Sequence, residues 1–354
     1  MDDDQFQDLM LQGVSRTFAL TIPQLPVRLH RVVANAYLLC RIADTIEDDP
    51  ALDPAQTSRF SEWLVDITMG EGDSAQFAQA LKPLLSDSTL PMEHELIGET
   101  PRVLAITAGF SEAQRAELAR CVRIMSRGMA RFQAGASVHG LADLPELDAY
   151  CYFVAGVVGE CLTGLFCDYS EEIAVNRDAM APLSVSFGQG LQMTNIIKDI
   201  WDDRARGVCW LPRDVFAAHG FDLSELDPDT ADPRFEAGLA DLIAIAMGHL
   251  RNALRFTLYI PAHERGIRNF CLWAIGMAVL TLRRVNAQRG FRAGSEVKIS
   301  RRSVRATVLG SKISAGSDGM LRLMLALMSR GLPRFEPERE RRVTAVGPQP
   351  EIRA

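Results

Sequence analysis

The sequence predicts an all-α fold, and two observations support this prediction. Hydrophobic residues make up 47% of the 354 residues and aromatic residues only 7%, so the apolar mass is mostly Ala, Leu, Val, Ile and Met, a set that favours helices. Proline is absent between Leu183 and Leu211 and between Ala262 and Leu332. Long proline-free stretches with a hydrophobic period of 3.6 residues indicate helices. We find no convincing alternation of period 2 and no hairpin signal.

In chain order, helical periodicity is expected near residues 25–48, 54–69, 74–86, 92–108, 112–135, 145–168, 173–204, 235–258, 264–287 and 317–331. Three segments are expected to be non-helical. Residues 220–234 are rich in Asp and Pro and predict a surface loop, and residues 289–316 are basic and interrupted by glycines. Residues 334–354 carry many charges and few apolar residues, which predicts a disordered tail after a single domain of residues 1–333.

Charge and cysteine usage exclude some classes of function. The net charge of −7 argues against nucleic acid as a partner. The seven cysteines form no CxxC pair, which indicates buried thiols in a reducing compartment and argues against bound zinc. The acidic start, Met1 to Asp4, is opposite to a signal peptide, and the longest uncharged apolar stretch, Phe270 to Leu282, has 13 residues. A membrane-spanning helix needs roughly 18 or more, so we expect a cytoplasmic protein with no transmembrane segment.

The first informative motif is the acidic run that begins at Asp44. Asp44, Glu47 and Asp48 stand at i, i+3 and i+4, which places them on one helix face. Like charges at this spacing repel each other, so a shared cation would favour the arrangement. Arg41 lies one turn earlier and could hold a diphosphate bidentately. The alternative is a helix end that frays into solvent before Pro50.

The second motif extends from Gln192 to Asp203. Gln192, Asn195, Asp199 and Asp203 stand at i, i+3, i+7 and i+11, a single helical stripe of residues with oxygen ligands. A core face would not present four polar residues in a row, because each buried polar group needs a partner. An exposed stripe is the alternative, although apolar residues surround the motif in sequence.

Two such motifs indicate Mg²⁺, a cation that takes hard oxygen ligands and bridges to substrate phosphate. A polyanionic substrate is then expected, most simply a diphosphate. The absence of a GxxxxGK[ST] loop argues against a P-loop nucleotidase. Metal bound to a diphosphate stabilises it as a leaving group, and in an apolar cavity its departure leaves a shielded carbocation.

Glycines interrupt the helices expected at 145–168 and 173–204. Gly156, Gly159 and Gly164 lie in the first of these helices, and Gly188 and Gly190 lie in the second. Because a glycine inside a helix costs ~1 kcal/mol relative to alanine, these positions need a reason. Room for a long apolar chain is one reason, and close helix packing is the other.

Four stretches together resemble the squalene and phytoene synthases, the head-to-head prenyl transferases. They are Ser15 to Phe18, Arg41 to Asp48, Tyr150 to Gly159, and Gln192 to Asp203. With the intervening segments, the resemblance covers roughly residues 10–333. It implies a helical bundle of the isoprenoid-synthase type around a central apolar cavity.

Within the family, the likeness is greatest to squalene synthases. Phe270 to Ile275 resembles a late core helix of these enzymes, and Val297-Lys298-Ile299 followed by Arg301 and Arg302 resembles the basic segment linked to NADPH. Trp210-Leu211-Pro212 departs from the Arg-x-Arg-x-Tyr-Leu-Pro form of phytoene synthases. The tail here is polar, whereas the eukaryotic members carry a membrane anchor after the core. We therefore expect at most peripheral contact with a membrane, for release of an apolar product.

The resemblance implies that two farnesyl diphosphates condense to presqualene diphosphate, which is then reduced by NADPH to squalene. Enzymes of the family that make dehydrosqualene, hydroxysqualene or phytoene remain alternatives, as does a non-catalytic prenyl-binding relative. The implied metal ligands are Asp44, Glu47, Asp48, Asn195, Asp199 and Asp203. The implied substrate contacts are Ser15, Arg16, Phe18, Arg41, Gln192, Asn195 and Lys198. Tyr150 would act near the proton-transfer step, and Lys298, Arg301 and Arg302 would contact the cofactor.

Overall fold

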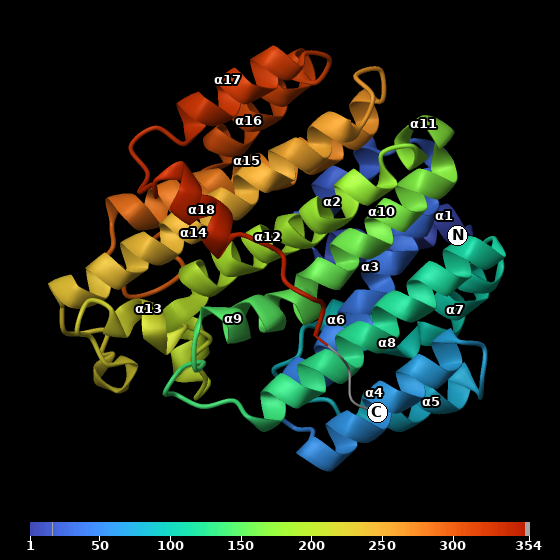
Figure 1. The fold of residues 1–354 in the computed structure, drawn as a ribbon. Coiled ribbons are helices and arrows are strands. Elements are labelled where there is room, and N and C mark those ends of the chain that lie inside the picture. Colours follow the sequence, from blue (N-terminus) through green and yellow to red (C-terminus); the bar gives the residue numbers. More distant parts are fainter. Residues whose placement is uncertain (16, 351–354) are drawn as a thin grey trace. The chain divides into compact units, whose positions relative to one another are not determined.

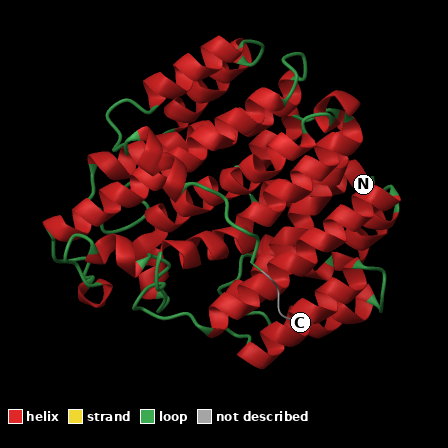
Figure 2. Cartoon of the chain, viewed as in Figure 1, coloured by secondary structure: helices red, strands yellow, loops and turns green. Residues whose placement is uncertain are grey.

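The computed structural model describes residues 1–15 and 17–350, and every regular element in this part of the chain is helical. The one β-type pairing among the described residues is an isolated bridge between Leu141 and Pro212. Figure 2 shows helices joined by short loops. The all-α prediction is confirmed. The chain divides into two compact units, the first comprising residues 1–134 and 160–177 and the second residues 135–159 and 178–350.

The first unit is built around α3 (Val27–Asp48), which packs against α1 (Asp3–Val14), α4 (Pro54–Thr68), α6 (Pro91–Gly98), α7 (Thr100–Ala108) and α8 (Glu112–Ala134). Buried Leu38, Leu39, Ile42 and Ile46 explain this central place, because they give α3 apolar contacts along its length. Capping boxes start α1 at Asp2 and α4 at Asp53, where each aspartate accepts from the backbone of a glutamine three residues later.

The second unit is built on α12 (Arg177–Ala205), α14 (Pro233–Tyr259) and α15 (Arg265–Ala287). Helices α16 (Arg301–Ser314) and α17 (Asp318–Met328) pack on α15 as an outer layer (Figure 1). Arg268 of α15 is buried and joins these layers. Its guanidinium donates to the backbone oxygens of Ile260 and Ala315 and to the Asp318 carboxylate at 2.8 Å.

The remaining elements are short or interrupted. They are α2 (Phe18–Thr21), η1 (Ile22–Gln24), α5 (Ser74–Leu81), η2 (Lys82–Leu84), α9 (Leu144–Cys151), the π-helical turn η3 (Tyr152–Gly156), α10 (Val157–Tyr169), α11 (Glu171–Ala174), α13 (Arg213–Ala217), η4 (Leu223–Glu225) and α18 (Pro337–Val343). The long helices thus confirm the sequence periodicity. Residues 92–108 instead form two helices, because Pro101 has no backbone N–H to continue the first and lies in the opening turn of the second.

Two segments differ from the sequence-based expectation. Residues 289–316 are not wholly non-helical, since α16 begins at a Ser300 cap whose side chain accepts from the backbone of Ser303. Residues 334–354 contain α18, which we expected to be disordered. This helix packs on α14, where Glu340 pairs with Arg251 and Thr344 is buried beside Gly248. In both cases long-range packing stabilises a polar helix that local composition does not favour.

Two helical stretches of the described chain are long and apolar enough, by length and composition alone, to cross a membrane. They are Leu144–Tyr169 and Arg265–Ala287. Within the structure, 67% and 61% of their apolar windows are buried. This burial agrees with the expectation that Phe270 to Leu282 belongs to a core helix.

Candidate active site

The first acidic motif lies on the last turns of α3. The Arg41 guanidinium is 3.6 Å from the Asp44 carboxylate and 3.8 Å from that of Glu93, at the start of α6. The side chains of Arg41, Asp44 and Glu93 are between 17% and 28% exposed, so they line a partly shielded surface of the first unit. Glu93 was not predicted, because nothing in its local sequence indicates a contact with Arg41, 52 positions earlier.

Burial is the main cause of the raised pKa of Asp44, which reaches about 6. The charge of Arg41 partly offsets this effect, and the nearby Asp48 and Glu93 carboxylates add to the rise in pKa. A half-buried carboxylate among other carboxylates favours a bound cation, which would remove the repulsion. The alternative of a frayed helix end does not describe Asp44, because α3 continues to Asp48.

Asp49 belongs to the same acidic run but has a structural role. It is only 6% exposed. Its carboxylate accepts from the backbone N–H of Ala51 and Ser86 and from the Thr89 hydroxyl. These bonds fix the loop that leads into α6, and therefore the position of Glu93.

Two of the predicted substrate contacts, Ser15 and Phe18, are linked to Arg41 through Tyr37. The Phe18 ring packs on the Tyr37 ring with centroids 5.1 Å apart, and the Ser15 hydroxyl accepts from the Phe18 backbone N–H. The Tyr37 hydroxyl accepts from the Arg41 guanidinium at 3.0 Å. Ser15 and Phe18 are therefore connected to the first motif through Tyr37. Arg16, predicted with them, lies outside the described residues.

The second acidic motif lies in the second unit on α12, which is continuous through Gln192 to Asp203 as the sequence predicts. Gln192, Lys198 and Asp199 are partly exposed and Asn195 is exposed, whereas Ile196, Ile197 and Ile200 are buried on the opposite side. Lys198 pairs with Asp199 at 2.9 Å, and Arg206 pairs with the buried Asp203. Gln192, Asn195 and Asp199 thus form an accessible stripe on a helix that its isoleucines anchor in the core, whereas Asp203 at the end of the motif is buried.

The loop before α16 lies against this motif. The Trp201 indole donates to the backbone oxygen of Phe291. A Cβ at Gly294 would lie 3.1 Å from carboxylate oxygens of both Asp199 and Asp202, so only glycine leaves these oxygens uncrowded. Lys298 is exposed and follows Gly294 by four residues, so their Cα atoms are within roughly 14 Å of each other. Arg301 and Arg302, also exposed, begin α16.

Tyr150 is also in the second unit, in the last turn of α9, and it is buried. Its ring stacks on Trp210 with centroids 4.2 Å apart and planes 11° from parallel. Trp210 is held there because residues 209–213 exchange backbone hydrogen bonds with residues 137–141. The π-helical turn η3 begins two residues after Tyr150, and such turns are frequent at functional sites.

The helix glycines serve close packing within each unit. A Cβ on Gly159 would lie 2.2 Å from the Ser184 backbone oxygen, and one on Gly188 would lie 2.2 Å from that of Ala155. Similar contacts surround the other helix glycines, at Gly156, Gly164 and Gly190. Of the two reasons considered for these glycines, the structure therefore supports close packing over room for a substrate chain.

The donor set of the two motifs fits Mg²⁺. Among residues 1–15 and 17–350, no three His, Cys, Asp or Glu side chains are grouped as a complete metal cage. Mg²⁺ does not require one, because it keeps several waters and is usually held by one or two carboxylates together with substrate phosphate. Asp44 and Asp48 offer two carboxylates from α3. On α12 Asp199 offers one, and the buried Asp203 would add a second on release from Arg206.

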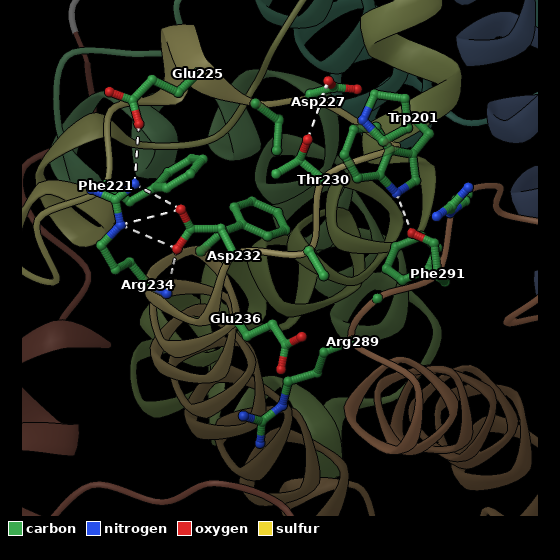
Figure 3. A pocket seen from close by; sticks show the side chains of 16 residues that line it. Trp201, Phe221, Glu225, Asp227, Thr230, Asp232, Arg234, Glu236, Arg289 and Phe291 are labelled. Atoms are coloured by element: carbon green, nitrogen blue, oxygen red, sulfur yellow. Dashed lines mark hydrogen bonds and ion pairs between the residues drawn. The ribbon is translucent and has the colours of Figure 1, made fainter.

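A separate pocket of about 280 Å³ is lined in part by Trp201 (Figure 3). Three arginines on its rim already have acceptors in the protein: Arg234 pairs with Asp232 and Glu225, Arg289 donates to Asn286, and Arg292 pairs with Asp229. Aromatic rings and four carboxylates share this rim. The pocket is thus less suited to a diphosphate than the two acidic motifs.

Comparison with solved structures defines the class of fold as that of the all-helical isoprenoid synthases. A TcSQS complex with the ligand BPH1237 aligns with a TM-score of 0.71 and 22% identity, covering 97% of both chains. A dehydrosqualene synthase in complex with a ligand aligns with a TM-score of 0.64 and 19% identity, covering 88% of this chain and 95% of the other.

The sequence comparisons narrow this class to one family. The squalene/phytoene synthase family model matches residues 11–303, and the chain therefore belongs to this family. Squalene synthases from Botryococcus braunii and Gibberella zeae are each 30% identical over 77% of the chain, and one from Cyberlindnera jadinii is 27% identical over 89%. The chain covers 56% of the length of the first two relatives and 69% of the third.

Proposed function

We propose that this protein is a squalene synthase. It would condense two farnesyl diphosphates head to head to presqualene diphosphate and then convert this intermediate to squalene in a Mg²⁺- and NADPH-dependent reaction. The observation that carries the proposal is the pair of acidic motifs on accessible helix faces, in a family member 30% identical to squalene synthases. A non-catalytic relative would have no need of both motifs.

In the condensation, one farnesyl diphosphate loses pyrophosphate, and its allylic C1 bonds to C2 of the second molecule, which leaves a cation at C3. The same C1 then loses a proton as its bond to C3 closes the cyclopropane. Asp44, Glu47 and Asp48 would hold Mg²⁺ on one helix, and Asn195, Asp199 and Asp203 would hold it on the other. Mg²⁺, when bound, neutralises the departing diphosphate. Arg41 and Lys198 would donate to diphosphate oxygens, and Glu93 would orient Arg41.

Other residues would orient the substrates and handle the proton. Ser15, Arg16, Phe18 and Gln192 would contact substrate near the two motifs. Tyr150, held by its stack on Trp210, would accept or return the proton lost in cyclopropane closure. Its aromatic ring would also stabilise positive charge on a neighbouring carbon.

The second half-reaction breaks the remaining carbon–oxygen bond of presqualene diphosphate, releases a second pyrophosphate and rearranges the carbon skeleton. NADPH, when bound, supplies the hydride that ends the reaction and leaves as NADP⁺. Lys298, Arg301 and Arg302 would bind its phosphates. The contact of Gly294 with Asp199 supports this assignment, because it brings the loop before Lys298 to the second motif.

Incubation of the purified protein with farnesyl diphosphate and Mg²⁺, with and without NADPH, tests the proposal. We expect pyrophosphate release under both conditions, squalene only with NADPH, and presqualene diphosphate without it. If the product in the presence of NADPH is dehydrosqualene, hydroxysqualene or phytoene, the protein is another enzyme of the same family and the proposal is wrong. No pyrophosphate release under either condition would indicate a non-catalytic relative.

A further inference from the structure

The outer faces of α16 and α17 concentrate exposed apolar side chains. Of the fourteen large hydrophobic residues that are exposed in the described chain, five lie between residues 309 and 327. They are Leu309, Ile313, Met320, Leu323 and Leu327, with exposed fractions from 46% to 67%. Their spacing is helical, i and i+4 on α16 and i, i+3 and i+7 on α17, so each helix presents one apolar stripe to solvent.

Helix α16 has the reverse of the usual amphipathic arrangement. Its buried residues are Thr307, Ser311 and Ser314, whereas Leu309 and Ile313 are exposed. The buried hydroxyls of Ser311 and Ser314 are satisfied by backbone oxygens one turn earlier on the same helix. A helix that only covered α15 would place its aliphatic residues inward. The outward stripe therefore indicates a surface that binds another apolar surface, either a protein or a membrane.

The charges beside these stripes are almost all positive. Between residues 301 and 330 the exposed charged residues are Arg301, Arg302, Arg305, Lys312, Arg322 and Arg330. The one acidic residue, Asp318, is paired with Arg268. On a chain with a net charge of −7, this is a local basic surface, complementary to anionic groups.

We propose that the outer face of α16 and α17 docks on an anionic lipid bilayer. Leucine, isoleucine and methionine side chains would enter the headgroup region, and the basic residues not assigned to the cofactor would contact lipid phosphates. These are Arg305, Lys312, Arg322 and Arg330. A second copy of the chain fits this face less well. A two-fold contact would bring each patch against itself and oppose like charges.

Sedimentation with lipid vesicles tests the surface, with the full chain and without substrate, so the outcome does not depend on the proposed activity. The vesicles are phosphatidylcholine alone, or phosphatidylcholine with about a third phosphatidylglycerol. We expect binding mainly to the anionic vesicles, which weakens as salt rises from about 0.05 to about 0.5 M. Leu323→Ser with Leu327→Ser, and separately Arg305→Glu with Arg322→Glu, should each lower the partition coefficient at least tenfold.

The matched control replaces two exposed apolar residues elsewhere, Leu90→Ser (56% exposed) with Val175→Ser (85% exposed), and should leave binding unchanged. Circular dichroism confirms that each variant is folded. Absence of wild-type binding to the anionic vesicles, or equal loss in the control, would overturn the proposal. So would a wild-type dimer in analytical ultracentrifugation that Leu323→Ser with Leu327→Ser dissociates, because the face would then be an interface between copies.

Discussion

At the scale of single residues, the first acidic motif combines two roles within six positions. Asp44 is half-buried beside Arg41 and other carboxylates, whereas Asp49 is saturated with donors from the 86–89 loop. Asp49 thus has its hydrogen-bond acceptors filled by the protein, whereas Asp44 is left beside other carboxylates that repel it. The difference can be measured by making the same substitution at both positions.

Asp44→Asn should abolish turnover and leave the fold intact. Loss of a ligand charge removes stabilisation of several kcal/mol from the departing diphosphate, so we expect kcat for pyrophosphate release to fall by at least about a hundredfold, with little change in the melting temperature.

Asp49→Asn is the matched control for this substitution. It should lower the free energy of unfolding by about 1–3 kcal/mol, because one of its acceptor oxygens becomes a donor that faces donors. The folded protein should keep far more of its kcat than Asp44→Asn does, because the remaining carbonyl oxygen still accepts from the loop that positions Glu93. Full activity in Asp44→Asn would contradict the assignment of this residue.

A second residue-scale feature is a buried polar cluster near Tyr150. His249 is 1% exposed, and its Nδ1 lies 2.8 Å from the Ser186 hydroxyl. The Asn252 amide donates to that hydroxyl, which can then donate to Nδ1 and leave the proton of neutral His249 on Nε2. Nε2 lies 3.9 Å from Asp148, beyond hydrogen-bond range. Burial, with the Asp214 charge, raises the pKa of Asp148 to about 7.

This raised pKa predicts a pH dependence of stability. The unfolded chain loses the Asp148 proton near pH 4 and the folded chain near pH 7, so Asp148 lowers stability progressively across this range and by a constant amount above it. Asp148→Asn should therefore gain stability relative to wild type as pH rises from about 4 to about 7, by up to about 4 kcal/mol.

Urea unfolding at several pH values measures this difference. Burial lowers the pKa of His249 to about 3. Neutral His249 therefore contributes its full share of stability above pH 6.5, and this share is lost progressively as the pH falls from 6.5 to about 3. This second slope is common to both proteins and cancels in the comparison. If the stability difference between Asp148→Asn and wild type does not vary with pH, Asp148 has the same pKa in the folded and unfolded chains, and burial does not raise it.

At the scale of elements, glycines set how closely helices approach. Gly188→Ala would place a methyl group 2.2 Å from the Ala155 backbone oxygen, which cannot yield as a side chain would. Gly310→Ala, in the middle of α16, meets only the Met324 sulfur at 3.7 Å. Gly188→Ala should destabilise the protein by about 1–3 kcal/mol or more, and Gly310→Ala should stabilise it by up to about 1 kcal/mol.

Denaturant unfolding of both variants is the measurement. The two substitutions are chemically identical and both are in helix interiors, so helix propensity favours alanine at each. Equal changes in the two variants would mean that the close approach of α12 to residue 155 does not limit stability.

The elements also differ in how far the sequence predicts them. Long helices such as α3, α12 and α14 follow from apolar periodicity, because each buries a broad face. Helices α16 and α18 could not be predicted in this way. The first has hydroxyls on its buried face and the second has no fully buried side chain, so both depend on contacts distant in sequence.

At the scale of the whole molecule, the chain is stabilised without disulfides. All seven cysteines are free and buried, and burial raises the pKa of the thiols of Cys151 and Cys271. Ellman's reagent should therefore label almost no thiol in the native protein and seven after unfolding, and a reductant should leave the melting temperature unchanged. Rapid labelling of a native thiol, or fewer than seven after unfolding, would contradict this arrangement.

The candidate site was predictable where its chemistry lies on one helix. The stripe from Gln192 to Asp203 and the triplet Asp44, Glu47 and Asp48 follow from spacing alone. The contacts of Glu93 with Arg41, Trp210 with Tyr150, and Gly294 with Asp199 join residues far apart in sequence. No local pattern encodes such contacts, and they became visible only in the folded chain.

The proposed reductive step is the central claim, and transfer of a labelled hydride tests it most directly. The protein is incubated with farnesyl diphosphate, Mg²⁺ and NADPH that carries deuterium at one of the two C4 positions, and the hydrocarbon product is examined by gas chromatography with mass spectrometry. We predict squalene one mass unit heavier with one of the two labelled cofactors and unlabelled squalene with the other. A product that carries no deuterium from either cofactor, or the absence of squalene, would contradict the account.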